Sequence, residues 1–416
     1  MGENKIFVDI GSTIIKYFRL GQEGEIIDGG FFYRDYDRLV SEQITDILEK
    51  EIGWMEGRDS GRICSSANGG LAIGIVGYTE LYSSSWAAKA AFNSGANVRW
   101  STDLKEVHKY DITPVDILVI AGGANKSPIK NQLFWIDEIN KLGIKSDAVV
   151  FAGNCDLAEK VKSIWPSAII ADNVLGEDMS WNGQSLSHIL RAAYLNDLVL
   201  SKGIAGLEKF SEVPIFPTPA VVQKAYDAIL LGESSLRYPT PFVLIDIGGA
   251  TTDLFYGGEL VEDGVNNQPC QSTNRYVFSY LGVSASKNQL LNHLSLHKHL
   301  GDFLRALDEK SSEQLYLALK EGCVDWVTPE FLAEACFFLA LSECFSGLVG
   351  GHKIAIGRAS AVIVTGGASQ ICDEIRLQKL LDLFGVGHVK VILDYDYQVW
   401  IEGMTQLNLV QKGFVE

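Results

Sequence analysis

Two glycine turns, each led by an aspartate, carry residue types that are suited to holding phosphate. The turns lie more than half the chain apart. Glycine lets backbone N–H groups approach a polyphosphate closely, while serine, threonine and lysine add hydroxyl donors and a point charge. The phosphate-binding residues predicted from this pattern are Gly11, Ser12, Thr13 and Lys16 in the first turn and Gly248, Gly249, Ala250, Thr251 and Thr252 in the second.

The aspartates that open the turns are Asp9 and Asp246. A carboxylate gains little from touching phosphate, but Mg²⁺ is commonly held by one or two carboxylates, several waters and substrate phosphates. We therefore expect Asp9 and Asp246 to orient magnesium-bound waters. We also expect them to be the catalytic pair, because one of them could position or deprotonate an attacking water. Two such turns predict one nucleotide gripped between two domains.

The elements that position these residues are predicted from the apolar pattern. Each aspartate ends a short apolar strand, at 6–8 and 243–245, and each turn leads into another strand rather than a helix. A third apolar strand starts at residue 361 and ends in a backbone that could pack against a flat ring. Its residues Gly366, Gly367 and Ala368 are the predicted adenosine-binding segment. Helices are expected at 371–383, at 220–229 and at 397–409.

The region after the first turn is predicted to be ordered. An apolar stripe at helical spacing covers 37–52. Strands at 117–123 and 148–154 are each followed by a stretch compatible with a helix, at 130–141 and 156–165. That alternation predicts a βαβ pair with a parallel sheet.

Composition favours a globular protein of two or three domains. The chain has 416 residues, of which 47% are hydrophobic and 21% charged. The formal net charge of −17 argues against a general role with nucleic acid or an anionic membrane, since both attract basic surfaces. No apolar run reaches the length of a membrane span, and no signal peptide is visible, so a cytoplasmic location is expected.

Cysteine and histidine are interpreted as structural. The seven cysteines are scattered and include no Cys-x-x-Cys pair, which favours reduced and partly buried thiols. An iron–sulfur cluster shared across a dimer is the alternative. His293, His297 and His299 are expected on the solvated face of a helix over 288–307 rather than at a zinc site.

Taken in order, the two turns and the segment at Gly366 resemble the phosphate-1, phosphate-2 and adenosine motifs of the actin, sugar-kinase and heat-shock-chaperone ATPase superfamily. The resemblance implies an α/β, two-lobed actin-like ATPase (ribonuclease H-like) fold, with the nucleotide cleft between the lobes and an inserted α/β region in the first lobe. The first lobe would span 1–235, with the insert at about 54–200, and a C-terminal helix at 397–416 would complete it. The second lobe would span 236–396. ATP and Mg²⁺ are the implied cofactors.

A narrower resemblance covers nearly the whole chain and is best from Asp9 to Asp253. The segments 65–71, 86–91, 121–123, 152–154, 214–219 and 246–253 together look like the GlmL/MutL family. Its members are encoded beside adenosylcobalamin-dependent glutamate mutase and are unrelated to the mismatch-repair protein of the same name. The family implies a slow ATPase that acts as a chaperone or reactivating factor, with a cobalamin-dependent mutase subunit as its partner.

The chain departs from the family pattern after the second turn. Where the resemblance leads us to expect Arg-Thr-Val-Glu-Gly-Asp-Leu-Gly, residues 275–282 carry Phe278 and Tyr280 in place of the two acids. After the strand at 117–123, Ala124-Asn125-Lys126 replaces a turn of the Thr-Asp-Gly type. Asp9, Asp246 and the glycines of both turns are kept, so ATP binding is still expected.

Three other functions stay open from the sequence. A small-molecule kinase of the same superfamily would use Asp246 or Asp253 to deprotonate a substrate hydroxyl. An electron-transferring activator of radical dehydratases shares the opening Asp-x-Gly-Ser-Thr-x-x-Lys pattern but needs cysteines that bind a cluster. A non-catalytic, nucleotide-gated module would bind a partner through residues 54–200. The client, the oligomeric state and the choice between ATP binding and hydrolysis are also open.

Overall fold

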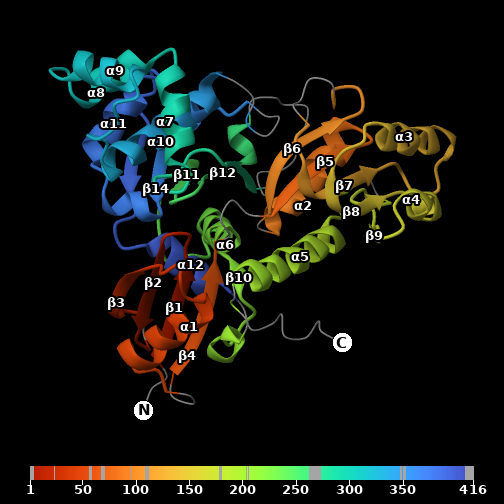
Figure 1. The fold of residues 1–416 in the computed structure, drawn as a ribbon, viewed down its shortest axis with the longest axis horizontal. Helices are drawn as coiled ribbons and strands as arrows, with labels where there is room; N and C mark the ends of the chain where they lie inside the picture. Colours follow the sequence, from red (N-terminus) through yellow and green to blue (C-terminus); the bar gives the residue numbers. More distant parts are fainter. Residues whose placement is uncertain are drawn as a thin grey trace. The chain divides into compact units, whose positions relative to one another are not determined.

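The computed structural model describes residues 4–407 except 23, 56–58, 67–70, 95, 108–111, 178–179, 203, 205, 262–272, 347–348 and 350–352. The chain forms two compact units (Figure 1). The core unit comprises Met1–Asn68 and Gly206–Glu416, and the inserted unit comprises Gly69–Ala205. The core unit contains two mixed sheets, and the inserted unit contains a parallel sheet.

The first sheet of the core unit contains the first glycine turn. Its five strands lie in the order β10-β4-β1-β2-β3. Strands β1, β2 and β3 are antiparallel neighbours, and β4 and β10 continue the sheet in parallel on the other side of β1. The turn joins β1 directly to β2, as the sequence predicts. The bounds are β1 Asn4–Ile10, β2 Ile14–Leu20, β3 Ile26–Tyr33, β4 Asp59–Ser65 and β10 Phe216–Pro217.

The second sheet of the core unit repeats this topology around the second turn. Its order is β13-β12-β11-β14-β15, with an antiparallel β11, β12, β13 meander and with β14 and β15 parallel to β11. The bounds are β11 Phe242–Ile247, β12 Thr252–Gly257, β13 Thr273–Phe278, β14 Ala361–Thr365 and β15 Lys390–Leu393. Two sheets of one topology, each with a hairpin at its central strand, form the predicted actin-like ATPase fold.

Two equivalent helices follow the last strands of the two sheets. Helix α6 (Thr218–Leu231) follows β10, and α12 (Gln398–Thr405) follows β15. They approach so closely that a Cβ on Gly403 would lie 2.1 Å from the carbonyl oxygen of Val221. The ring of Trp400 also meets the ring of Phe7 edge-on, with centroids 6.3 Å apart. Both connecting helices predicted from the sequence are therefore present, but α12 ends at Thr405, and residues 408–416 of the predicted C-terminal helix lie outside the described residues.

The remaining helices of the core unit cover the two sheets. The predicted apolar stripe at 37–52 becomes α1 (Val40–Asp46) and a π-helical turn (Ile47–Glu51), with Val40, Ile44 and Leu48 buried. A large apolar core joins the second sheet to a layer of helices. These are α7 Lys287–Leu296, α8 Leu300–Leu307, α9 Ser312–Lys320, α10 Pro329–Ser346 and α11 Glu374–Asp382.

Two helix predictions need correction. The helix expected at 288–307 is broken, because the backbone is extended at His297 between α7 and α8. His297 is half-buried rather than solvated, with its Nε2 2.9 Å from Ser342 Oγ and its ring 5.1 Å from that of Phe338. The helix expected at 371–383 begins only at Glu374, where Asp373 accepts a hydrogen bond from the N–H of Arg376 and caps α11.

The inserted unit is a parallel α/β sheet. Its strand order is β6-β5-β7-β8-β9, and the predicted βαβ pair forms as β7, α3, β8 and α4. The strands are β5 Ala72–Gly77, β6 Asn97–Asp103, β7 Val115–Gly122, β8 Ser146–Gly153 and β9 Ile169–Ile170. The helices are α2 Ser85–Asn93, α3 Lys130–Lys141, α4 Ala158–Ile164 and α5 Gln184–Lys202.

The start of the inserted unit differs from the sequence expectation of about residue 54. Strand β4 pairs with β1 over its whole length and so belongs to the first sheet of the core unit. The inserted unit therefore starts at Gly69. None of the helices in the described residues has the length and apolar character needed to cross a membrane.

Candidate functional site

The tips of the two hairpins meet in the core unit. The hydroxyls of Thr13 and Ser284 are 2.7 Å apart, and Ser284 lies in the loop that supports the second tip. A Cβ on Gly249 would lie 2.8 Å from Thr13 Oγ1 and 3.0 Å from Ser12 Oγ. Glycine at 249 therefore allows the tips to approach, and residues predicted from two distant turns lie at one place.

The first turn is tight because its glycine has no side chain. The N–H of Gly11 donates to the carbonyl of Ile14 at 2.9 Å, which closes the turn between β1 and β2. A Cβ on Gly11 would lie 2.6 Å from that same oxygen. The carbonyl of Ser12 accepts a hydrogen bond from the Tyr36 hydroxyl, so the tip is also fixed from outside the hairpin.

Asp9 is fully engaged by neighbouring side chains. Its Oδ2 is 2.9 Å from Lys16 Nζ, and its Oδ1 accepts hydrogen bonds from Thr218 Oγ1 at 2.6 Å and from the Cys64 thiol at 3.3 Å. The indole N–H of Trp400 donates to Cys64 Sγ at 3.2 Å. Elements β2, β4, α6 and α12 thus all contribute to holding one carboxylate.

Lys16 is held under two aromatic rings. Its Nζ lies 4.6 Å from the centroid of Tyr397 and 4.8 Å from that of Trp400, within the range of a cation–π interaction. Burial alone would lower the pKa of Lys16, but the negative charge of Asp9 and further contributions from Tyr397 and Asp246 outweigh it and raise that pKa. Lys16 therefore stays a cation beside the first turn.

A loop that the sequence did not reveal supports the second turn. The N–H of Gly248 donates to the carbonyl of Thr251 at 2.9 Å, and the carbonyls of Gly249 and Ala250 accept hydrogen bonds from Ser284 and Ser286. Gly282 leaves room for this contact, since a Cβ there would lie 2.4 Å from the carbonyl carbon of Ala250. The run of mostly small residues at 282–286 was the feature of the sequence that could have predicted this loop.

Thr252 lies apart from the other residues predicted for the second turn. Its side chain is buried, and its hydroxyl donates to the carbonyl of Leu281 at 2.9 Å. Thr251, in contrast, is half-buried at the tip, with its hydroxyl 3.3 Å from Asp253 Oδ2. The alternation of a β-strand turns Thr252 into the interior of the core unit and leaves Thr251 near the site.

Asp246 has no compensating partner comparable to Lys16. No hydrogen bond from another described residue reaches its carboxylate. Burial and the charge of Asp253 raise the pKa of Asp246 to about 7. Asp253 itself accepts two hydrogen bonds from Arg275, at 2.7 and 2.5 Å. The second hairpin thus places a half-buried carboxylate in the site with little neutralisation.

The predicted adenosine segment lies against Asp246. Gly366 has φ +79°, and a Cβ there would lie 2.2 Å from Asp246 Oδ1. Gly367 has open space at its Cβ position, whereas Ala368 is buried. Gly366 therefore lets β14 pass next to the carboxylate, and Gly367 offers backbone that a flat ring could approach.

Asp394 is an acid of the site that the sequence analysis missed. It directly follows β15 and is buried, and it accepts hydrogen bonds from Thr365 Oγ1 at 2.7 Å and from the N–H of Gln398 at 2.7 Å. Burial raises its pKa against these hydrogen bonds and the charge of Lys16. An acid at the end of an apolar strand, the same signal that Asp9 and Asp246 give, could have identified it.

The two aromatic residues that replace the expected acids pack against the apolar core beside the second sheet of the core unit. Phe278 is buried at the end of β13. The ring of Tyr280 stacks on that of His293 with centroids 4.3 Å apart, and its hydroxyl lies 3.5 Å from Glu343. Both positions thus contribute to packing behind the loop at 282–286.

The carboxylates fit Mg²⁺ better at Asp246 than at Asp9. Mg²⁺ is typically bound through one or two carboxylates together with phosphates and waters. Asp246 offers unengaged oxygens, whereas both oxygens of Asp9 already have protein partners. Asp246 would therefore hold the ion or its waters, and Asp9 would act through Lys16. Within the described residues, no group of three or more His, Cys, Asp or Glu side chains is arranged to bind a metal ion.

The cysteines of the described residues are free thiols, as predicted. Cys64, Cys336, Cys344 and Cys372 are buried, and Cys155 and Cys323 are exposed. Burial and the charge of Asp9 raise the pKa of the Cys64 thiol. Cys270 lies outside the described residues.

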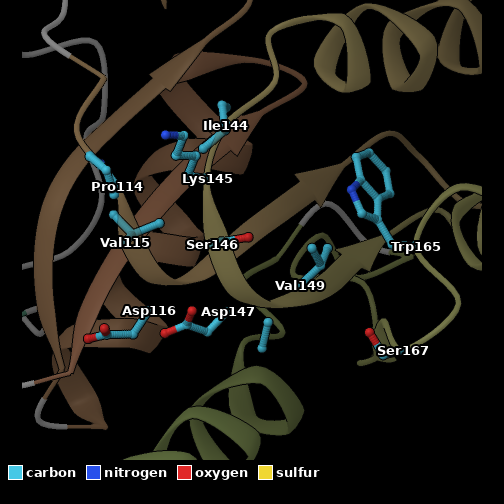
Figure 2. A pocket seen from close by; sticks show the side chains of 11 residues that line it. Pro114, Val115, Asp116, Ile144, Lys145, Ser146, Asp147, Val149, Trp165 and Ser167 are labelled. Carbon is cyan, nitrogen blue, oxygen red and sulfur yellow. The ribbon is translucent and has the colours of Figure 1, made fainter.

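The inserted unit has a depression of about 560 Å³ (Figure 2). It lies at the amino ends of β7 and β8, near Asp116, Lys145 and Asp147. Asp116 is already engaged, because its carboxylate accepts the N–H of Ala72 at 2.6 Å. Open parallel sheets bind ligands at the carboxyl ends of their strands, so this depression is a weaker candidate than the hairpin site.

Comparison with solved structures gives weak overall likenesses. The activator of the 2-hydroxyisocaproyl-CoA dehydratase from Clostridium difficile with bound ADPNP is 9% identical with a TM-score of 0.37, covering 98% of this chain and 95% of that one. A ligand-bound xylulose kinase from Lactobacillus acidophilus is 11% identical with a TM-score of 0.37, covering 99% and 90%.

Comparison of sequences is more specific. The protein MutL from Clostridium tetanomorphum is 30% identical over 264 residues, which cover 60% of this chain and 56% of that protein. The match therefore spans little more than half the length of that relative. The model of the family described as MutL protein matches residues 5–370, which include both hairpins and the Gly366 segment. The chain thus belongs to the MutL protein family, the one associated with glutamate mutase and not that of mismatch repair.

Proposed function

We propose that this protein binds ATP with Mg²⁺ between its two hairpins, hydrolyses it slowly, and acts as a reactivating factor for an adenosylcobalamin-dependent mutase. The observation that carries the nucleotide part is the meeting of the two tips, with Lys16 and Asp246 beside them. The actin-like fold and the family association with glutamate mutase support the rest. Bound Mg²⁺ would supply positive charge to the phosphates.

Each group of site residues has a separate role in this proposal. Backbone N–H groups and hydroxyls of residues 11–13 and 248–251 hold the phosphates. Lys16 places its charge on them, and Asp9 keeps Lys16 in position. Asp246 would hold Mg²⁺ or its waters and orient the attacking water; burial and the charge of Asp253 raise its pKa in the absence of the metal. Gly366, Gly367 and Ala368 border the adenosine.

Calorimetry tests the nucleotide site. Asp246→Ala should lose most of its affinity for ATP in the presence of Mg²⁺ and its ATPase activity, because the uncompensated carboxylate is removed. Asp9→Ala should weaken binding through the displacement of Lys16. Asp302→Ala is the matched control, since Asp302 is an exposed acid on α8. Undiminished affinity and hydrolysis in both site variants would overturn the assignment.

The client is tested separately. A mutase inactivated by turnover should regain activity when this protein, ATP, Mg²⁺ and fresh adenosylcobalamin are added. The Asp246→Ala variant should fail in the same mixture. Recovery that is equally fast without the protein would refute the reactivating role and leave the nucleotide site standing.

A small-molecule kinase is the second candidate, because a carboxylate with a pKa of about 7 also suits deprotonation of a substrate hydroxyl. ADP release that rises sharply with one metabolite would favour it. Tight ATP binding without turnover under either condition would instead favour a nucleotide-gated module that binds a partner.

A further inference from the structure

Strand β3 forms a free edge of the first sheet. It pairs with β2 and with no other described strand, and it runs for eight residues, Ile26–Tyr33 (Figure 1). The N–H of Arg34 donates to the carbonyl of Thr13, which fixes the alternation of the ladder. Backbone groups of Gly29, Phe31 and Tyr33 must therefore point away from β2. These groups are ready to pair with another strand.

The edge has little of the usual protection against such pairing, since its one irregularity, a register shift against β2, lies at the start of the strand at Ile26. Natural edge strands are commonly guarded by lysine, proline or inward-pointing charges. β3 has no lysine or proline, and Asp28 is its single charged residue. Phe31 is 52% exposed and Tyr33 is 83% exposed. A long, apolar and unprotected edge is typical of a strand that has a partner.

Arg34, one residue beyond β3, has unsatisfied donors. Its Nε and Nη1 are buried and form no hydrogen bond within the described part of the chain. The guanidinium lies 5.1 Å from the ring centroid of Tyr36, a contact that leaves these N–H groups unpaired. Buried donors without acceptors are costly. An acceptor from outside the chain would remove that cost.

We propose that β3 pairs in antiparallel fashion with β3 of a second copy of this chain, about a two-fold axis at Phe31. In that register Phe31 stands opposite the partner's Phe31, and Tyr33 stands opposite the partner's Gly29. Asp28 stands opposite the partner's Arg34. Odd-numbered residues stand opposite odd-numbered residues, because the backbone groups that point away from β2 belong to Gly29, Phe31 and Tyr33.

Charge and shape in this register favour a second copy over an unrelated strand. The guanidinium of Arg34, whose Nε and Nη1 lack acceptors, meets a carboxylate, and the two-fold axis forms that ion pair twice. Asp28 can take the extra donor, because its partners in the described part of the chain are the Tyr17 hydroxyl at 2.8 Å and Arg19 at 3.7 Å. Each of the two glycines of the strand receives an aromatic ring from across the interface, a favourable cross-strand arrangement.

Charge exchange tests the pairing of Asp28 with Arg34. Sedimentation velocity at physiological salt should show a dimer for the natural chain and a monomer for Arg34→Asp and for Asp28→Arg, each of which sets like charges opposite. The double variant Asp28→Arg/Arg34→Asp restores the opposite charges and should restore the dimer. Arg305→Asp, at an exposed arginine on α8, should leave the dimer intact. Circular dichroism checks that each variant is folded.

Disulfide trapping tests the axis independently of charge. Opposed residues of a hydrogen-bonded antiparallel pair have Cα atoms about 5.5 Å apart, a distance that a disulfide spans. In a background where Cys155, Cys270 and Cys323 are replaced by serine, Phe31→Cys should oxidise to a covalent dimer. Tyr33→Cys, although at a more exposed position, should not, because the two copies of residue 33 are separated along the strands. A monomeric natural chain, a dimer that survives Arg34→Asp, or equal cross-linking of the two cysteine variants would overturn the proposal.

Discussion

The two hairpins share a topology and a sequence pattern, yet they treat their leading aspartates in opposite ways. Asp9 stands opposite Lys16 in the register of β1 and β2 and is held by three side chains. Asp246 stands opposite Asp253 in the register of β11 and β12 and has no such partners among the described residues. One carboxylate is neutralised and the other is left available. A repeated motif therefore need not repeat its chemistry.

The neighbouring strand explains much of the difference. In the first sheet β4 places Cys64 next to Asp9, and the thiol donates to the carboxylate. In the second sheet β14 places Thr365 next to Asp246, but its hydroxyl donates to Asp394 instead. Asp394 thus accepts the hydrogen bond from Thr365 that could otherwise have stabilised the charge of Asp246. The first hairpin is built to hold a cation, and the second is built to keep a carboxylate free.

The largest expected effect comes from removing Asp9. Asp9→Ala should destabilise the nucleotide-free protein by about 3–5 kcal/mol, because it leaves the largely buried Lys16 without its counter-charge. Unfolding in urea measures the loss. Asp246→Ala should not cause a loss of this size, since no cation depends on Asp246 alone.

The double variant Asp9→Asn/Lys16→Met sharpens this test. It removes both charges of the pair, so it should recover a large part of the stability that Asp9→Ala loses. Equal losses for the single and the double variant would mean that packing, and not the ion pair, makes Asp9 important.

Removing the carboxylate of Asp246 should change the folding stability in the opposite direction from removing that of Asp9, and the size of the change should depend on pH. Its pKa is raised to about 7 in the folded protein, so the folded state binds this proton more tightly than the unfolded state. The stabilisation is complete below about pH 4 and is lost as the pH rises to about 7. Asp246→Asn removes this dependence. Its stability relative to the natural protein should rise by about 2–3 kcal/mol between pH 5 and pH 8.

Thermal or urea unfolding without nucleotide and with a chelator measures this change. Asp302→Asn is the control, because hydrogen bonds from His299 and Arg305 lower the pKa of this exposed carboxyl instead of raising it. A flat difference between the natural protein and Asp246→Asn from pH 5 to pH 8 would show that Asp246 is neutralised by a contact other than those described.

Local sequence signals were sufficient for the two hairpins and for β14, whereas the fold was expected from the family resemblance. Apolar strands ending in Asp9 and Asp246, followed by glycine turns, predicted both hairpins, and the strand before Gly366 predicted β14. These signals work because turn geometry and strand burial depend on residues that are close in the chain.

The contacts that distinguish the hairpins could not be predicted in this way. Thr218 lies more than two hundred residues from Asp9, and Trp400 lies still farther from Cys64, so their hydrogen bonds depend on tertiary packing. The same holds for Ser284 at the first tip and for Asp394 beside Thr365. Identical Asp-Ile-Gly triplets contain no information about which side chains other elements bring to them.

A smaller effect is expected from closing the space beside Asp246. Gly366→Ala places a Cβ 2.2 Å from Asp246 Oδ1 and forces alanine into φ +79°. The variant should lose about 1–3 kcal/mol of stability and should also move the carboxylate, so ATP affinity should fall with it. Gly367→Ala is the matched control, because no atom lies within 4 Å of its Cβ position. Equal losses for both glycines would contradict the close contact with Asp246.

The smallest difference compares two buried threonines, one beside each hairpin. Thr218 donates to the charged Asp9 at 2.6 Å, whereas Thr252 donates to the neutral carbonyl of Leu281 at 2.9 Å. Valine has nearly the shape of threonine without the hydroxyl. Thr218→Val should therefore cost about 2 kcal/mol and Thr252→Val about 1 kcal/mol in urea unfolding, because hydrogen bonds to charged groups contribute more. Only Thr218→Val should also weaken ATP binding, since it loosens the carboxylate that positions Lys16. Equal effects of the two variants on both measurements would mean that Asp9 does not depend on α6 for its orientation.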